Sequence, residues 1–362
     1  MGARAFEDVQ SQLGASKTEL VDLLGVGPAD VVCIFLGGSI AEGLGNPRSD
    51  VDVYLIVESL APFKAAEERF KSLQLGDRIV APAFFSTDAV MDAYRRAGAG
   101  GVLSTAEIDL LHRIGAGIAL VNEQAYEHLR AQLPREALAR LLVRSGEAML
   151  ANIFADVIGT LEANDLPTCA FNARSLIDCA MDAYLAMRGD TLAREKWRYR
   201  KIERTLGLQD SVAHRYLELA SAVRFGEAEV TFDYVEKCLE LYQRIETRLV
   251  AYALDPSFPA ILSSGKSESA APGVGQPRRN PLIKMAHEPD GTLILIERSP
   301  LFRLSAPYSL IWLTIDGARR QGEAARVATE MARATGRESA GLEKTYASCL
   351  AEWSSAGLLV AS

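Results

Sequence analysis

Two apolar runs, residues 31–36 and 51–57, place the strongest constraint on the fold of this chain. Both are rich in β-branched and aromatic residues, which predicts buried strands. Gly37, Gly38 and Ser39 close the first run, and this triplet indicates a tight turn that opens a short helix. The chain is therefore expected to be organised around a strand, a turn and a second strand near its N-terminus.

Two carboxylates mark the start of the second strand. Asp50 and Asp52 point to the same side, because successive side chains of a strand alternate between its faces. Neighbouring acids repel each other unless a cation lies between them. A Mg²⁺ ion held by both carboxylates and by the phosphates of a nucleotide would remove this repulsion. The two glycines leave room for a triphosphate, whose oxygens can reach backbone N–H groups and the Ser39 hydroxyl.

This combination resembles the nucleotidyltransferase superfamily, which includes the polymerase-β and kanamycin-nucleotidyltransferase families. The resemblance covers the apolar strand ending in Gly-Gly-Ser and the Asp-x-Asp pair on the next strand. It implies a Mg²⁺-dependent enzyme that transfers a nucleoside monophosphate from an NTP. Asp50 and Asp52 would be the catalytic metal ligands. The nucleotide-binding residues would be Gly37, Gly38 and Ser39.

The third expected strand, residues 78–85, departs from the pattern of these families. They often carry a third metal-binding carboxylate there, whereas the centre of this strand reads Ile-Val-Ala-Pro-Ala-Phe and holds no acid. Asp77, at the entry to the strand, is the nearest substitute and is interpreted as a turn residue. We therefore expect a site of two carboxylates.

Composition limits the classes of partner. The chain has 362 residues, enough for two or three domains, and a net charge of −8, which disfavours a nucleic-acid partner but leaves room for a local basic patch. No apolar run approaches the roughly 20 residues that span a bilayer, and the N-terminus lacks a signal-peptide pattern, so we expect no membrane partner and a cytoplasmic location. The scattered cysteines predict buried free thiols and no zinc site.

Helical periodicity dominates the chain up to residue 254. Helices are predicted over residues 6–24 and 62–73, and from Thr105 to a break at Gly115 and Gly117 that precedes a short strand. His112 lies in that last helix and is interpreted as a structural residue. Residues 135–254 repeat apolar positions at three- and four-residue spacing, which predicts an antiparallel helical bundle.

Two stretches of this bundle offer cations to a nucleotide. Arg174 and Asp178 are four residues apart on one predicted helix, so they either form a surface ion pair or place Arg174 against a phosphate beside an acid. Lys196 lies in the basic and aromatic run 194–201, which is either a solvated helix start or a nucleotide-facing patch. In layout, a bundle after such a core resembles the helical substrate domain of the antibiotic nucleotidyltransferases.

Residues 263–281 are rich in Gly, Ser and Pro, which predicts a flexible linker with little shared core across it. A hairpin is predicted beyond it around Asp290-Gly291, because glycine tolerates the positive φ of the turn. A third strand is expected at Phe302, Arg303 and Leu304. Helices are expected over residues 306–314, 322–335 and 339–356.

This tail resembles the PqqD-like family of small winged-helix domains, also called RiPP recognition elements. The resemblance spans residues 282–362 and is carried by Trp312-x-x-x-Asp316-Gly317, Trp353 and the closing Gly-Leu-Leu-Val. It implies that the tail binds the leader of a ribosomally made precursor peptide. The binding mode would be addition of a strand to the edge formed by Phe302, Arg303 and Leu304.

Together these patterns predict an α+β chain. Its parts would be a nucleotidyltransferase core with a mixed sheet and flanking helices (1–125), a helical bundle (126–262), the linker (263–281) and a PqqD-like peptide-binding domain (282–362). The expected function is nucleotidylation of a precursor peptide that the tail recruits. Two alternatives stay open: nucleotidylation of a small aminoglycoside-like molecule, and a degenerate nucleotidyltransferase that acts as a peptide-binding scaffold.

Overall fold

The structure, a computed structural model, describes residues 5–64, 70, 73–222, 227–263, 276–296, 300–316, 319–337 and 339–361. The chain is of mixed α+β type and divides into two compact units. The first unit comprises Met1–Leu141 and Gly189–Arg200, and the second comprises Leu142–Arg188 and Lys201–Ser362. No helix in the described ranges is both long and apolar enough to cross a bilayer.

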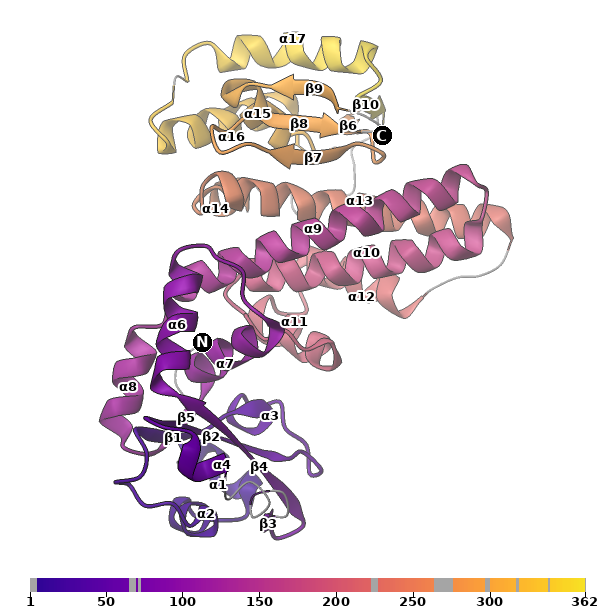
Figure 1. Cartoon of the computed structure of the whole chain (residues 1–362). Helices are drawn as coiled ribbons and strands as arrows, with labels where there is room; N and C mark the ends of the chain where they lie inside the picture. Colours follow the sequence, from indigo (N-terminus) through magenta and orange to yellow (C-terminus); the bar gives the residue numbers. More distant parts are fainter. Residues whose placement is uncertain are drawn as a thin grey trace. The chain divides into compact units, whose positions relative to one another are not determined.

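A five-stranded mixed sheet in the order β3-β4-β2-β1-β5 forms the centre of the first unit (Figure 1). β2 and β4 run parallel, whereas the other neighbours are antiparallel. The strands are β1 (Cys33–Leu36), β2 (Val51–Val57), β3 (Gln74–Leu75), β4 (Arg78–Ser86) and β5 (Ile118–Val121). The strands predicted for the two apolar runs and for residues 78–85 are confirmed.

The helices of the first unit are short and lie against this sheet. They are α1 (Glu7–Leu13), α2 (Lys17–Leu24), α3 (Gly38–Ala41), α4 (Ala61–Lys64), α6 (Thr87–Gly98), α7 (Thr105–Ala116) and α8 (Glu123–Ala131), with a 3₁₀ turn at Glu195–Trp197. The helix expected over residues 62–73 is described only for the part within α4, and most of its remainder lies outside the described residues.

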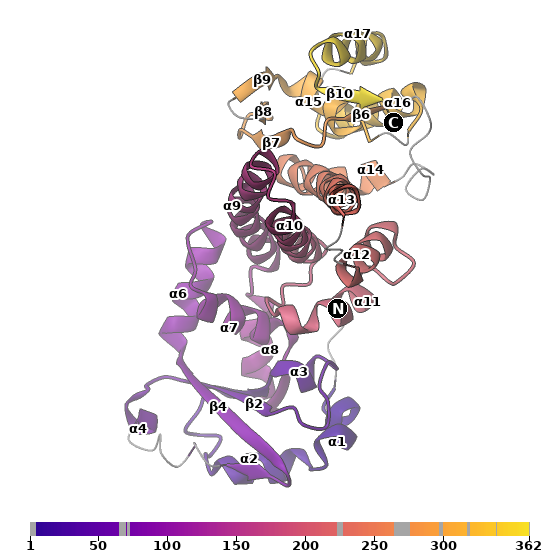
Figure 2. The same ribbon diagram turned by 90° about the vertical axis from the view of Figure 1, so that its right-hand side faces the viewer.

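The two faces of the sheet differ, because side chains alternate along each strand. Ile34 and Leu55 belong to the apolar cluster that α1 and α2 complete. On the opposite face Phe35 stacks on its cross-strand partner Tyr54 with ring centroids 5.1 Å apart. Asp52, two residues before Tyr54, belongs to this second face. Figure 2 shows α1 and α2 on one side of the sheet and α7 on the other.

The single helix predicted over residues 6–24 is wrong, because the chain forms two helices there. Gly14 ends α1 in a left-handed conformation with φ of +70°. Ser16 then caps α2: its hydroxyl accepts from the backbone N–H of Glu19, and the Glu19 carboxylate accepts from the backbone N–H of Ser16. This reciprocal pair stabilises a new helix start, so the apolar spacing continues across a real break.

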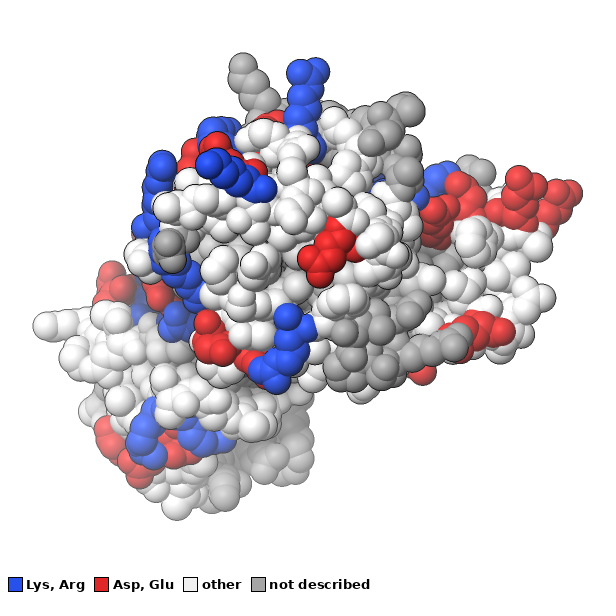
Figure 3. Space-filling model, turned by 90° about the horizontal axis from the view of Figure 1, so that it is seen from above, with Lys and Arg blue, Asp and Glu red and all other residues white. Residues whose placement is uncertain are grey.

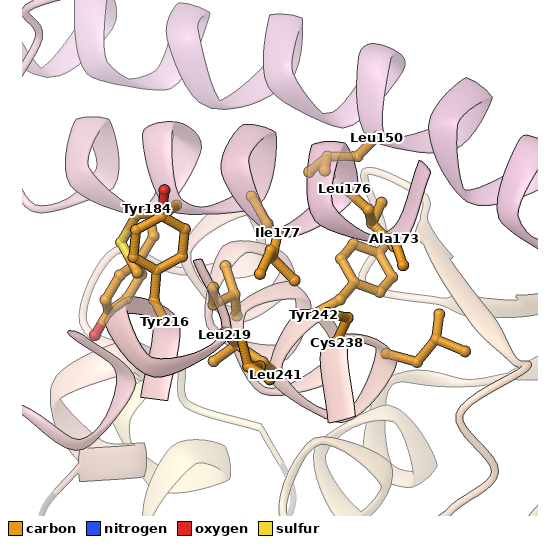
Figure 4. Packing of buried hydrophobic residues seen from close by; sticks show 14 of the residues in the cluster. Leu150, Ala173, Leu176, Ile177, Tyr184, Tyr216, Leu219, Cys238, Leu241 and Tyr242 are labelled. Carbon is orange, nitrogen blue, oxygen red and sulfur yellow. The ribbon is translucent and has the colours of Figure 1, made fainter. Parts of the chain in front are cut away.

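The predicted helical bundle is confirmed in the second unit. Its helices are α9 (Arg135–Glu162), which begins in the first unit, and α10 (Leu166–Met187), α11 (Arg198–Thr205), α12 (Ser211–Ser221), α13 (Ala228–Leu254) and α14 (Phe258–Ser263). One buried cluster joins α9, α10, α12 and α13 (Figure 4). The residues labelled there are Leu150, Ala173, Leu176, Ile177, Tyr184, Tyr216, Leu219, Cys238, Leu241 and Tyr242.

The C-terminal region adds a three-stranded antiparallel sheet, a two-stranded sheet and three helices. The strands are β6 (Pro277–Arg279), β7 (Lys284–His287), β8 (Leu293–Ile296), β9 (Pro300–Leu304) and β10 (Leu359–Ala361), and the helices are α15 (Ala306–Leu313), α16 (Gln321–Ala334) and α17 (Leu342–Ser355). The predicted hairpin is confirmed as β7–β8, with Gly291 at φ of +89° in its turn. The third strand and the three helices are also found where they were expected.

The expectation of little core across residues 263–281 is wrong. Phe258 of α14 and Val250 of α13 lie in the same buried cluster as Trp312 of the C-terminal region. Residues 264–275 lie outside the described part, but the end of the segment forms β6, which pairs with β10. The bundle and the C-terminal region are therefore packed together inside the second unit.

One face of the C-terminal region is not acidic, although the net charge of the chain is negative. In the view of Figure 3, the centre of this face carries few charged side chains, and Lys and Arg gather toward one edge. An ion pair joins Arg303 of β9 to Glu288, next to β7. Exposed pairs of this kind contribute little to stability.

Candidate functional site

The turn after β1 is held directly against β2. The backbone N–H of Gly37 donates to the carbonyl of Asp52 over 2.9 Å. Gly38 has φ of +69°, and a Cβ there would lie 1.8 Å from Asp52 Oδ2. A Cβ on Gly37 would lie 2.6 Å from the Tyr54 ring. Both glycines are therefore required by the close approach of β2 side chains, in addition to any room they leave for a ligand.

Ser39 follows in the first turn of α3 and is half-buried. Its carbonyl accepts from the backbone N–H groups of Leu44 and Gly45, both over 2.8 Å. Its hydroxyl makes no hydrogen bond with any described residue, so it can donate to a ligand without breaking an internal bond.

Asp52 is a partly buried carboxylate in a field of opposing charges. Its pKa is raised, mainly because burial removes water from the carboxylate, and Asp50 and Asp109 raise it further by repulsion. Arg113 and Lys196 act in the opposite direction. The raised pKa indicates that Arg113 and Lys196 do not fully offset the free-energy cost of keeping the Asp52 carboxylate charged away from water. An added cation would lower that cost.

Helix α7 supplies one wall of the site. Arg113 Nη1 donates to Glu42 Oε1 over 2.7 Å, and Arg113 Nη2 lies 3.5 Å from Asp109 Oδ1. Arg113 also hydrogen-bonds Tyr54, whose pKa is raised to about 12, chiefly by burial. Because Arg113 is committed to these three groups, it holds the wall in place and is not a free phosphate ligand.

His112 lies next to this arginine and is buried. Its Nδ1 is 2.9 Å from Thr191 Oγ1, and its Nε2 is 3.1 Å from Glu42 Oε1. These contacts agree with the interpretation of His112 as a structural residue. Through Thr191 they also tie the returning segment, residues 189–200, to α7 within the first unit.

The returning segment brings two exposed cations to the site. Arg194 Nη2 lies 2.9 Å from Asp109 Oδ2, and this hydrogen bond is the main cause that raises the pKa of Arg194, with Tyr54 and Asp52 acting in the same direction. Lys196 lies over the Trp197 ring, 5.6 Å from its centroid, and lowers the pKa of Asp52. The structure thus brings Lys196 together with Asp50, Asp52 and the glycine turn.

Arg174 belongs to the second unit, and its contacts there are with residues of α10 and α12. Its Nε lies 3.0 Å from Asp178 Oδ1, and its guanidinium also donates to the Ala220 carbonyl. Asp178 in turn accepts from the Tyr216 hydroxyl over 2.6 Å. Arg174 thus ties α10 to α12, and a role in phosphate binding stays a prediction.

The donor set available to a metal is the pair Asp50 and Asp52. Asp52 is the register partner of Ala81 on β4, and Asp77 lies in the turn between β3 and β4. Across the described ranges, no group of three or more His, Cys, Asp and Glu side chains is placed to hold a metal ion. Two carboxylates fit Mg²⁺, which usually keeps several waters and takes its other oxygens from substrate phosphates.

The predicted peptide-binding residues lie on β9, which is the outer strand of the order β7-β8-β9. Leu304 is buried, Phe302 packs against the same cluster, and Arg303 between them is exposed. The alternation shows that β9 has one face on the core and one toward solvent.

No model of a known protein family matches this chain, and no curated protein is significantly similar to it in sequence. Three residues of the site escaped sequence reasoning, namely Glu42, Asp109 and Arg113, whereas Arg194 belongs to the predicted basic run 194–201. The only sequence signal for them was the four-residue spacing of Asp109 and Arg113 on the helix that carries His112.

Proposed function

We propose that the first unit transfers a nucleoside monophosphate from an NTP to an acceptor, with Mg²⁺ as its cofactor. The observation that carries this proposal is the packing of Gly38 against the Asp52 carboxylate, which puts the start of α3 and an acid pair on one side of the sheet. In this proposal Asp50 and Asp52 are the metal ligands, and the turn and the Ser39 hydroxyl hold the triphosphate.

The charges around Asp52 support this assignment. Lys196 and Arg194 are exposed and can approach phosphate oxygens, whereas the anions Asp50 and Asp52 leave a need for a cation. The phosphates of a bound nucleotide would pair with Lys196 and Arg194, and its Mg²⁺ would pair with Asp50 and Asp52.

In the proposed reaction a hydroxyl of the acceptor attacks the α-phosphorus. A new oxygen–phosphorus bond forms, the bond from the α-phosphorus to the bridging oxygen breaks, and pyrophosphate leaves with that electron pair while the hydroxyl proton passes to water. Mg²⁺, when bound, neutralises charge on the phosphates. The chain itself contributes positioning and fixed charges, which is most of what phosphoryl transfer requires.

We propose that the acceptor is a precursor peptide whose leader adds a strand to β9. The outer position of β9 supports this mode, since strand addition needs an unpaired edge and pockets for alternate side chains. Leader binding would hold the modified end of the peptide at high effective concentration near the enzyme. An aminoglycoside-like acceptor is the second candidate, and the missing acid on β4 keeps a non-catalytic scaffold as the third.

The test is Mg²⁺-dependent release of pyrophosphate from each NTP, in Asp52→Asn and Asp50→Asn. We expect each change to lower the rate by about 100-fold or more, since each removes a ligand and half of the charge that binds Mg²⁺. Melting temperatures should hold or rise slightly, because the change relieves repulsion between neighbouring acids. Asp88→Asn, an exposed acid in the first turn of α6, is the matched control and should keep full activity.

Each other outcome selects a different candidate. Full activity in both site variants would remove Asp50 and Asp52 from catalysis. Pyrophosphate release that rises with an aminoglycoside but not with a leader-bearing peptide would favour the small-molecule acceptor. Peptide binding without pyrophosphate release from any NTP would favour the scaffold.

A further inference from the structure

A cavity of about 180 Å³ lies in the second unit, among α9, α13 and β7. It shares no residue with the site around Asp52. Part of its wall is apolar, and the rest consists of five polar or charged side chains. The apolar part includes Leu150, Leu249, Val250 and Met285, and the polar part is Glu147, Tyr242, Glu246, Lys284 and His287.

Glu246 provides a buried hydrogen-bond acceptor on this wall, with only 5% of its surface exposed. Its Oε1 accepts from the Tyr242 hydroxyl over 2.7 Å and from the backbone N–H of Met285 over 3.2 Å. Its Oε2 is buried and has no hydrogen-bond partner among the described residues. Buried polar atoms are nearly always partnered, so this oxygen indicates a donor that the chain itself does not supply.

Glu147 provides a second acceptor from a different helix. Its Oε1 is also buried without a hydrogen-bond partner in the described part of the chain. His287 Nε2 lies 3.8 Å from this oxygen, which is too far for a hydrogen bond. Lys284 lines the cavity but forms no ion pair with either glutamate within the described ranges.

We propose that this cavity binds a small primary ammonium compound with an alkyl body. An ammonium group carries three N–H donors and no acceptor, so it matches two open carboxylate oxygens from α9 and α13. Its positive charge is attracted by both carboxylates, neither of which forms an ion pair with Lys284 in the described ranges. The alkyl body packs on the leucine, valine and methionine side chains, and the volume exceeds that of engineered cavities of about 150 Å³ that take benzene.

The proposal does not depend on nucleotidyl transfer, and its test uses the full chain without NTP. Calorimetric titration with n-butylammonium chloride is compared with titration of n-butanol, which has nearly the same shape without the charge. We expect n-butanol to bind at least about tenfold more weakly, since it lacks the charge-assisted hydrogen bonds. Equal binding of the two would reduce the site to an apolar cavity and overturn the proposal, as would no detectable binding of the amine.

Three variants locate the binding. Glu246→Gln and Glu147→Gln keep the shape of the wall and should each weaken the amine by about tenfold while leaving n-butanol unchanged. Glu229→Gln, an exposed acid on the first turn of α13, should change neither ligand. Ala286→Leu fills part of the cavity from a half-buried position and should block both ligands. Unchanged amine binding in a folded Ala286→Leu protein would place the ligand elsewhere and overturn the proposal.

Discussion

Asp52 and Glu246 are both carboxylates removed from water, but the chain compensates them in different ways. Asp52 lies on an open face of a sheet, beside two other acids and cations that reach it from α7 and the returning segment. Glu246 lies between α13 and β7 and is held by Tyr242 and a backbone N–H. The Asp52 carboxylate is therefore balanced mainly by the charges around it, whereas the Glu246 carboxylate is held in a fixed position by two hydrogen bonds.

The difference also decides which neighbours each acid requires. Asp52 requires glycine at position 38, because its carboxylate occupies the space that a side chain would need. Glu246 requires compensating groups at a distance, and Arg279, which is fully buried with its pKa lowered to about 10 mainly by burial, is one of them. Adding a side chain at position 38 should therefore destabilise the first site. Removing the charge of Glu246 should change how the stability of the second site depends on pH.

The largest effect is expected for Gly38→Ala. The new Cβ would lie 1.8 Å from Asp52 Oδ2 in a left-handed backbone, so we expect a loss of about 4 kcal/mol in the free energy of unfolding. Gly76→Ala is the matched control: it has φ of +58° with no atom within 4 Å of the added Cβ, so it should lose only about 1 kcal/mol. Both losses are to be measured by chemical denaturation.

The same measurement in an Asp52→Ala background separates the two causes of that loss. Removing the carboxylate takes away the closest contacts, so the cost of Gly38→Ala should fall toward that of Gly76→Ala. A cost that stays at its original size would mean that the backbone, and not Asp52, demands the glycine.

The next effect concerns pH and Glu246, whose pKa is raised from 4.5 to about 7, mainly by burial. The folded protein holds this proton more tightly than the unfolded chain, so the associated stability is present below pH 4.5 and is lost as pH rises toward 7. The shift corresponds to about 3 kcal/mol. The groups that face this carboxylate are Tyr242, Arg279, Lys284, Glu147 and His287.

Glu246→Gln should remove this fall in the free energy of unfolding between pH 4.5 and 7, measured by chemical denaturation at a series of pH values. Glu229→Gln provides the control on the same helix and should leave the profile unchanged. A Glu246→Gln profile that still falls as steeply as that of the parent would assign the titration to another group.

Sequence reasoning predicted the first site better than the second for a physical reason. Asp50, Asp52 and the glycine turn follow one another closely on two paired strands, so local alternation and turn chemistry place them together. Arg194 and Lys196 join them only because the segment after α10 returns to the first unit, which no local pattern reports. Lys196 was predicted from its basic and aromatic neighbours, and its place beside Asp52 was not derivable from them.

The cavity around Glu246 had no local signal at all. Glu147 and Glu246 lie on helices far apart in the sequence, and each looks like an ordinary polar position in an amphipathic pattern. The packing of β7 on α13 buries Glu246 and places Glu147 at the same cavity, and the expectation of a flexible linker before β7 argued against any such packing. The composition of residues 263–281 does not describe the flanking regions, because Ile283 and Met285 just beyond it pack in one cluster with Val250 of α13.

The smallest predicted effects compare one lysine at each site. Lys196 lowers the pKa of Asp52 and Lys284 lowers the pKa of Glu246, and in each case the lysine is the weakest of the main contributors. Lys196→Met should therefore raise the pKa of Asp52 slightly, seen as an upward shift in the acid limb of pyrophosphate release. Lys284→Met should raise the pKa of Glu246 slightly, seen in the pH profile of stability.

Salt distinguishes the two effects. Lys196 is exposed, so its charge is screened at 1 M ionic strength, where the Debye length is about 3 Å. Glu246 is buried, so its interaction with Lys284 is screened much less. The Lys196→Met shift should vanish in high salt and the Lys284→Met shift should persist. If both vanish, Glu246 is reached by ions, and the contrast between an open and a fixed carboxylate fails.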